Sequence, residues 1–122
     1  MAKILVIEDI KEVRDTICKM LKRGGYEVIG AANGKEGLRL IEPHAPDAVV
    51  TDILMTEMDG LETIKFIVKT KPCLPVIAYT ASANTIFLKA AVKFGAVSGL
   101  QKPFKQRELL SEVQRALAKK WK

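Results

Sequence analysis

Apolar residues recur along this chain in two alternating patterns. Short, nearly continuous apolar runs are typical of strands that are buried on both faces of a sheet. Longer segments between these runs carry apolar residues three or four positions apart, which is the spacing of an amphipathic helix. The first pattern predicts strands at residues 4–7, 26–31, 48–52, 76–80 and 97–101.

Glycine and proline mark where each helical pattern stops, because glycine favours helix ends and proline cannot continue a helix. Asn33, followed three residues later by Glu36, has the pattern of a capping box at a helix start. The first predicted helix is residues 11–23, and the second carries Leu38 and Ile41 and is ended by Pro43 and Pro46. The third follows a loop through Gly60 and stops before Pro72. The fourth covers residues 86–94 and is closed by Gly95, and the fifth lies around residues 109–117.

Strand and helix therefore alternate five times, and no repeat or low-complexity tract interrupts them. This (βα)5 alternation with apolar strands predicts an α/β fold, a doubly wound parallel five-stranded sheet with helices on both faces. A chain of 122 residues has the usual size of one domain. We expect residues 1–122 to form a single domain.

Charged residues stand where three of the predicted strands end. Glu8 and Asp9 follow the first strand, Asp52 ends the third, and Lys102 follows the fifth. The carboxyl ends of parallel strands form one rim, where ligands bind in open α/β sheets. Carboxylates at ~4 Å repel one another by about 4 kcal/mol per pair at an effective dielectric near 20. We therefore expect a hard divalent cation such as Mg²⁺ to hold them together.

The composition agrees with a globular protein, at 48% hydrophobic and 28% charged residues. No apolar run is long enough to cross a bilayer, and no signal-peptide pattern precedes the first strand. We expect a cytoplasmic protein without membrane contact. Cys18 and Cys73 lack the spacing of a metal or redox motif and are expected to be free thiols.

Four segments, at residues 6–9, 52–60, 78–81 and 102–104, occur in the order and spacing found in one family. Each alone is weak evidence, but together they make the whole chain resemble the response-regulator receiver domains of two-component signalling. The resemblance implies the flavodoxin-like strand order 2-1-3-4-5, the order of flavodoxin and of the chemotaxis receiver.

The resemblance also implies roles for the acidic residues. Asp52 matches the phosphoacceptor, which attacks phosphorus and becomes an aspartyl phosphate. Asp9 and Glu8 match the pair that holds Mg²⁺, with Asp9 as a direct ligand and Glu8 acting partly through water. The backbone carbonyl of Leu54, two residues after the acceptor, is a further metal ligand in the family.

Four other residues match positions that assist the reaction. Lys102 supplies an ammonium group for the phosphoryl oxygens, and its bond to Pro103 is cis in the family. Thr80 matches the hydroxyl that donates to the phosphoryl group and moves towards it. Ala81 is small, as the family requires for access to the phosphate.

Plainer interpretations stand beside these roles. Asp52 can be a capping or metal-binding residue, Lys102 a solvated surface group, and Thr80 a β-branched strand residue that only packs. For Asp59 we favour such an interpretation, namely capping of the helix after Gly60. His44, between two prolines, is expected in a surface turn without a role.

Two residues depart from the family's pattern. Thr56 replaces the usual proline, which should loosen the loop after the acceptor. Gly99 stands three residues before Lys102, where the family places Tyr or Phe as a rotameric switch. The chemistry of phosphorylation is therefore expected to be intact, whereas its usual readout is not.

The two halves of the chain differ in charge. Residues 1–60 carry 8 basic and 11 acidic side chains, a net charge of −3, whereas residues 61–122 carry 12 basic and 3 acidic side chains, a net charge of +9. The family meets partners through its fourth helix, fifth strand and fifth helix. A basic surface there would fit an acidic protein partner, or only keep the protein soluble. Its candidate residues are Lys89, Lys93, Lys105, Arg107, Arg115, Lys119 and Lys120.

The expected function is that of a receiver which takes phosphate from a histidine kinase or phosphotransfer protein and changes its binding to a partner. It is expected to be a phosphoacceptor that assists its own phosphorylation and dephosphorylation rather than an enzyme, and a monomer or weak dimer. One alternative is a haloacid-dehalogenase-type phosphatase, although Leu54 occupies the place of its second Asp. A flavodoxin is disfavoured by Glu8 and Asp9, which would repel the flavin phosphate. A basic nucleic-acid-binding module is a further alternative, which no base-reading motif supports.

Overall fold

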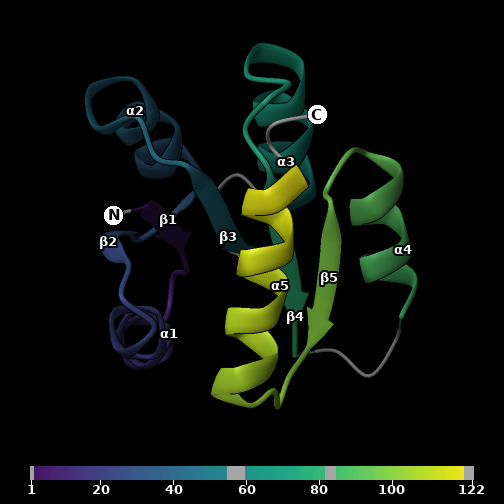
Figure 1. Ribbon diagram of the computed structural model, residues 1–122. Coiled ribbons are helices and arrows are strands. Elements are labelled where there is room, and N and C mark those ends of the chain that lie inside the picture. Colours follow the sequence, from purple (N-terminus) through teal and green to yellow (C-terminus); the bar gives the residue numbers. More distant parts are fainter. Residues whose placement is uncertain (1, 55–59, 82–84, 120–122) are drawn as a thin grey trace.

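The computed structural model describes residues 2–54, 60–81 and 85–119, in which strands and helices alternate along the chain (Figure 1). This alternation confirms the predicted (βα)5 organisation. The strands are β1 (Lys3–Ile7), β2 (Glu27–Ala31), β3 (Ala48–Asp52), β4 (Val76–Thr80) and β5 (Ser98–Gln101). The helices are α1 (Lys11–Arg23), α2 (Gly34–His44), α3 (Gly60–Thr70), α4 (Ile86–Lys93) and α5 (Gln106–Lys119).

All strand pairs are parallel, and their order is β2-β1-β3-β4-β5, as predicted. The central strand β3 pairs with β1 on one side and β4 on the other. Its five residues are all buried, which explains why its sequence is nearly continuous in apolar side chains.

The two-residue period of the strands divides the core into two layers. One face of the sheet, with Leu5, Ile7 and Val49, packs with residues of α2, α3 and α4. The opposite face packs with α1 and α5, and its strand residues include Val6 and Ile77. The sheet is thus covered on both sides, and its carboxyl rim is left for polar groups.

The structure corrects the predicted end of the second helix. Helix α2 continues through Pro43 to His44 and ends at Ala45, whose φ of 46° is left-handed. Proline adopts a helical φ, but it lacks the N–H donor and its ring crowds the carbonyl four residues earlier. Only His44 follows Pro43 in the helix before the left-handed Ala45. The exposed His44 is therefore the last helical residue and not part of a turn.

The other boundaries lie close to the predicted ones. Asn33 caps α2, and its side chain accepts a hydrogen bond of 2.9 Å from the Glu36 N–H. Helix α4 ends at Lys93, and Gly95 follows with a φ of 116°. No helix in the described parts of the chain is long and apolar enough to cross a membrane.

The start of α3 is pressed against the end of β3. A Cβ atom added at Gly60 would lie 2.1 Å from the Asp52 carbonyl oxygen and 2.4 Å from the Ile53 Cα. The Gly60 N–H donates to the Ile53 carbonyl at 2.8 Å. Only glycine fits this approach, which fixes the backbone beside Asp52.

Candidate functional site

Three polar side chains form a row across the carboxyl rim of the sheet. Asp52, the last residue of β3, is in register with Tyr79 of β4. Ile7 of β1 is in register with Thr51, so Glu8 continues β1 beside Asp52. Because residues two apart share a face, Asp52 and Tyr79 follow Val50 and Ile77 on the side that α1 and α5 cover.

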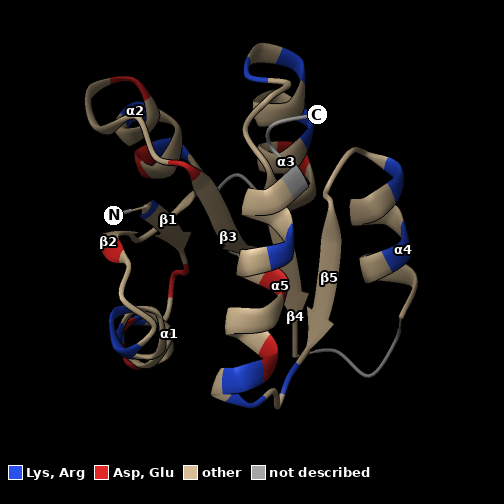
Figure 2. Cartoon of the chain, viewed as in Figure 1, with Lys and Arg blue, Asp and Glu red and all other residues tan. Residues whose placement is uncertain are grey.

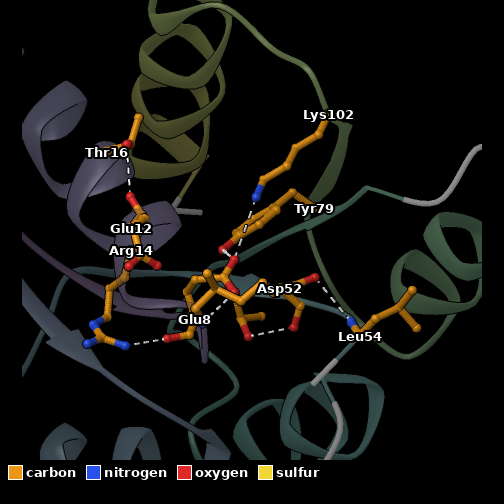
Figure 3. Close-up of polar contacts among 10 residues, drawn as sticks. Glu8, Glu12, Arg14, Thr16, Asp52, Leu54, Tyr79 and Lys102 are labelled. Carbon is orange, nitrogen blue, oxygen red and sulfur yellow. Dashed lines mark hydrogen bonds and ion pairs between the residues drawn. The ribbon is translucent and has the colours of Figure 1, made fainter. Parts of the chain in front are cut away.

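Glu8 is completely buried, and backbone and side-chain donors surround it (Figure 3). The Tyr79 hydroxyl donates to Glu8 Oε1 at 2.5 Å, and the Ile10 N–H donates to Oε2 at 3.1 Å. The guanidinium of Arg14 donates to the Glu8 carbonyl at 2.7 Å. Both oxygens of this carboxylate thus have a neutral donor, which compensates part of its lost hydration.

Asp52 is 9% exposed and its Oδ1 accepts a hydrogen bond of 3.1 Å from the Leu54 N–H. Burial first, and then the negative charge of Glu8, raise the pKa of Asp52 to about 7. The Leu54 N–H and the Lys102 ammonium oppose this shift. At neutral pH the group is therefore poised between carboxylic acid and carboxylate.

The rim has the donor set of a hard-cation site. Glu8, Asp9 and Asp52 each offer one carboxylate oxygen, and these oxygens lie within 4.8 Å of one another. Oxygen ligands alone suit Mg²⁺, and a cation there would relieve the repulsion that raises the pKa of Asp52. The residues present therefore fit the expected ion.

Lys102 reaches this cluster from the loop after β5. Its Nζ lies 3.7 Å from Glu8 Oε1 and 5.0 Å from the centroid of the Tyr79 ring. Its backbone N–H donates to the Thr80 carbonyl at 2.8 Å, and the Lys102–Pro103 peptide bond is cis, as the family resemblance implies. The ammonium group thus stands over the rim, and its side chain is 23% exposed.

The other residues that the comparison with the family singled out lie on β4, directly after it, and on β5. Thr80 ends β4 and is fully buried, whereas the neighbouring Ala81 is exposed. Gly99 lies in β5 beside Ala78, and a Cβ atom there would be 3.0 Å from Leu88 Cδ2 of α4. Leu88 therefore lies over the glycine. Thr56 and Asp59 lie outside the described residues.

The basic residues of the second half lie on α3, α4 and α5 and in the loops beside them (Figure 2). On α4, Lys89 and Lys93 are exposed and no acidic residue accompanies them. On α5, Glu112 pairs with Arg115 at 2.9 Å and Glu108 accepts the Lys105 N–H at 2.8 Å. Lys105 and Arg107 are also exposed. Helix α4 thus carries basic side chains and no acidic residue of its own, whereas α5 carries residues of both signs.

Tyr79 was missed as a site residue by sequence reasoning. The pattern of β4 indicated a buried strand, and its tyrosine was counted only as part of the family segment. The two-residue period of the strand could have indicated it, because Tyr79 lies on the same face as Ile77 and is paired with Asp52 on the neighbouring strand. Its partner Glu8 lies 71 residues away, so only the assembled sheet brings them together.

Comparisons with known proteins agree with this geometry. The response regulator receiver domain family matches residues 4–114. Response regulator MprA of Mycolicibacterium vanbaalenii is 38% identical over 115 residues, which cover 94% of this chain and 50% of that protein. The alkaline phosphatase synthesis transcriptional regulatory protein PhoP of Bacillus subtilis is 32% identical over 115 residues, covering 94% and 48%. The chain spans about half the length of these curated relatives.

Solved structures are similar over nearly the whole chain. A response regulator receiver domain protein from Clostridium thermocellum superposes with a TM-score of 0.92 at 32% identity, covering 98% of this chain and 97% of its own. Chemotaxis protein CheY4 of Vibrio cholerae superposes with a TM-score of 0.86 at 29% identity, covering 95% and 98%. By its sequence, its strand order and its acidic rim, this chain belongs to the response regulator receiver domain family.

Proposed function

We propose that Asp52 accepts a phosphoryl group from a histidine kinase or a phosphotransfer protein in a Mg²⁺-dependent reaction. One observation carries the proposal: three carboxylates from two neighbouring strands offer oxygens within 4.8 Å of one another at the ligand-binding rim. Membership in the receiver family supports it, because receivers act in two-component signalling.

In the proposed reaction, an Asp52 oxygen attacks phosphorus while the bond from phosphorus to the donor's histidine nitrogen breaks. The nitrogen keeps the electron pair of that bond, and the new bond is that of an aspartyl phosphate. A bound Mg²⁺ supplies charge neutralisation for the phosphoryl oxygens and the carboxylates. Phosphoryl transfer needs mainly positioning and such neutralisation, so the fixed rim suits it.

Each remaining group has a place in this reaction. The ammonium group of Lys102 stabilises the charge on the transferred oxygens, and the Thr80 hydroxyl donates to the phosphoryl group once it is attached. Ala81 leaves the entrance open because it has no long side chain. Asp9, Glu8 and the Leu54 carbonyl join Asp52 in holding the cation.

We place partner binding on α4, where Lys89 and Lys93 are exposed and the helix itself carries no acidic residue. An acidic protein surface would complement them. In the same proposal, residues 1–122 act as one receiver unit without direct contact to nucleic acid. A cytoplasmic location stays a prediction.

Intact-mass measurement after incubation with acetyl phosphate and Mg²⁺ tests the acceptor. The wild type should gain one phosphoryl group, and Asp52→Asn should gain none. Asp15→Asn is the matched control, because Asp15 lies on the exposed side of α1 in an ion pair with Lys11. Equal modification of Asp52→Asn and the wild type would show that Asp52 is not the acceptor.

A further inference from the structure

We propose that Tyr79 is a positioning residue of the acidic site. Its hydroxyl holds the Glu8 carboxylate in place for the cation, and its ring supports the Lys102 ammonium (Figure 3). The inference rests on the Mg²⁺ site proposed above and assigns to it a residue outside the acidic cluster.

Tyr79 is held rigidly enough to position a neighbour. Its side chain is fully buried, and Phe104 packs against its ring at a centroid distance of 5.8 Å and an interplanar angle of 71°. Strand pairing with Asp52 fixes its backbone on one side and pairing with Leu100 on the other. The hydroxyl therefore has one available direction, towards Glu8.

Neutral donors suit a carboxylate that must serve a cation. Glu8 is fully buried, and its two oxygens accept from the Tyr79 hydroxyl and the Ile10 N–H. Neither donor carries a charge, so the carboxylate is oriented while the cluster keeps its negative charge.

The same contact limits how closely Lys102 approaches Glu8. Lys102 Nζ forms an ion pair with Glu8 Oε1 at 3.7 Å, a distance longer than a hydrogen bond. The ammonium also lies over the Tyr79 ring at 5.0 Å, within the range of a cation–π contact. Without the hydroxyl, Oε1 loses its donor and the ammonium can move onto it, which places a positive charge at the cation site.

Removing only the hydroxyl tests the inference. Tyr79→Phe keeps the ring under Lys102 and against Phe104, and calorimetric titration with MgCl₂ measures the cation affinity directly. We expect the affinity to fall about tenfold, the low end for loss of a partner that orients a metal ligand. Tyr26→Phe is the matched control, because Tyr26 is the other tyrosine of the chain and packs at the opposite end of the same face.

A spectroscopic measurement on the wild type separates positioning from a merely structural role. In protein with ¹³Cζ-labelled tyrosine, the two tyrosines give two resonances, which Tyr79→Phe and Tyr26→Phe assign. The Tyr79 resonance should shift as Mg²⁺ is added and saturate together with the calorimetric isotherm, while the Tyr26 resonance stays in place. If Tyr79→Phe does not fold, Tyr26→Phe still assigns both signals and the same titration decides.

Two results would overturn the inference alone: a Mg²⁺ affinity of Tyr79→Phe within twofold of the wild type, or a Tyr79 resonance that does not respond to Mg²⁺ at saturation. A wild type that binds no Mg²⁺ would overturn both this inference and the proposed cation site. The two failures are therefore distinguishable.

Discussion

The carboxyl rim and the region of α4 and β5 are built in opposite ways. At the rim, Glu8, Asp52 and Tyr79 are held by strand pairing and by hydrogen bonds to buried groups. Helix α4 has eight residues, buries only Ala91 completely among them, and begins at Thr85 without a side-chain cap. A fixed rim favours chemistry that depends on position, whereas a short, lightly anchored helix costs little to move.

The surface of α4 strengthens this contrast. Ile86 and Val92 are 60% and 50% exposed, and Leu88 covers the space that a side chain at position 99 would occupy. In place of a switch aromatic, β5 has a glycine under an aliphatic side chain. The readout of phosphorylation is therefore expected to run through Thr80 and the packing of α4.

Lys102→Ala should show the largest effect, because it removes the ammonium from the rigid rim. We expect the rate of phosphorylation by acetyl phosphate to fall roughly 100-fold, as for loss of one donor at a developing charge. Time-resolved intact-mass measurement checks this. Lys22→Ala, on the exposed surface of α1, is the control; a rate for Lys102→Ala close to that control would remove Lys102 from the reaction.

Gly99→Tyr tests the other region. The new Cβ would start 3.0 Å from Leu88 Cδ2, so the Leu88 side chain must give way, and we expect a loss of about 1–3 kcal/mol in the free energy of unfolding. Adding Leu88→Ala should recover part of the loss, because it frees the space for the ring. Urea unfolding of the two single variants and the double variant measures this coupling, and additive effects would contradict it.

Asp52→Asn should stabilise the protein at pH 8 in the absence of divalent cations, by roughly 1–2 kcal/mol. The pKa of about 7 in the folded state lies above the ordinary value of 3.8 for an aspartate, so the folded state holds this proton more tightly. The stability that the Asp52 carboxyl contributes is fully present below its ordinary pKa of 3.8 and is lost as pH rises from there to about 7. Thermal unfolding of wild type and variant at pH 5 and pH 8 should show a larger difference at pH 8 than at pH 5.

A double reversal, Lys89→Glu with Lys93→Glu, should have the smallest effect. Exposed charges act mainly on encounter and are screened beyond about 8 Å at physiological salt. We expect association with the cognate partner to slow several-fold and to lose salt dependence, while phosphorylation of Asp52 is unchanged. Stopped-flow measurements at two ionic strengths give the association rate. An unchanged rate would mean that these lysines only keep the surface of α4 hydrated.

Much of the fold is encoded locally. Short, nearly continuous apolar runs predicted five strands and the helical spacing of apolar residues predicted five helices, and most boundaries agree within a residue or two. Local signals failed at Pro43: proline disfavours a helix locally, but the surrounding chain decides whether the helix stops before it or continues one residue past it.

The sequence by itself also determined that Glu8, Asp9, Asp52 and Lys102 meet, since residues that end parallel strands share one rim. Tertiary structure alone decided how they meet. The bond from Tyr79 to Glu8 and the contact of Leu88 with Gly99 join segments far apart in the chain, and the distance from Lys102 to each acid depends on packing. The two-residue period of a strand determines on which face of the sheet a side chain lies. Its contacts with other strands, loops and helices depend on side-chain packing, which no local pattern encodes.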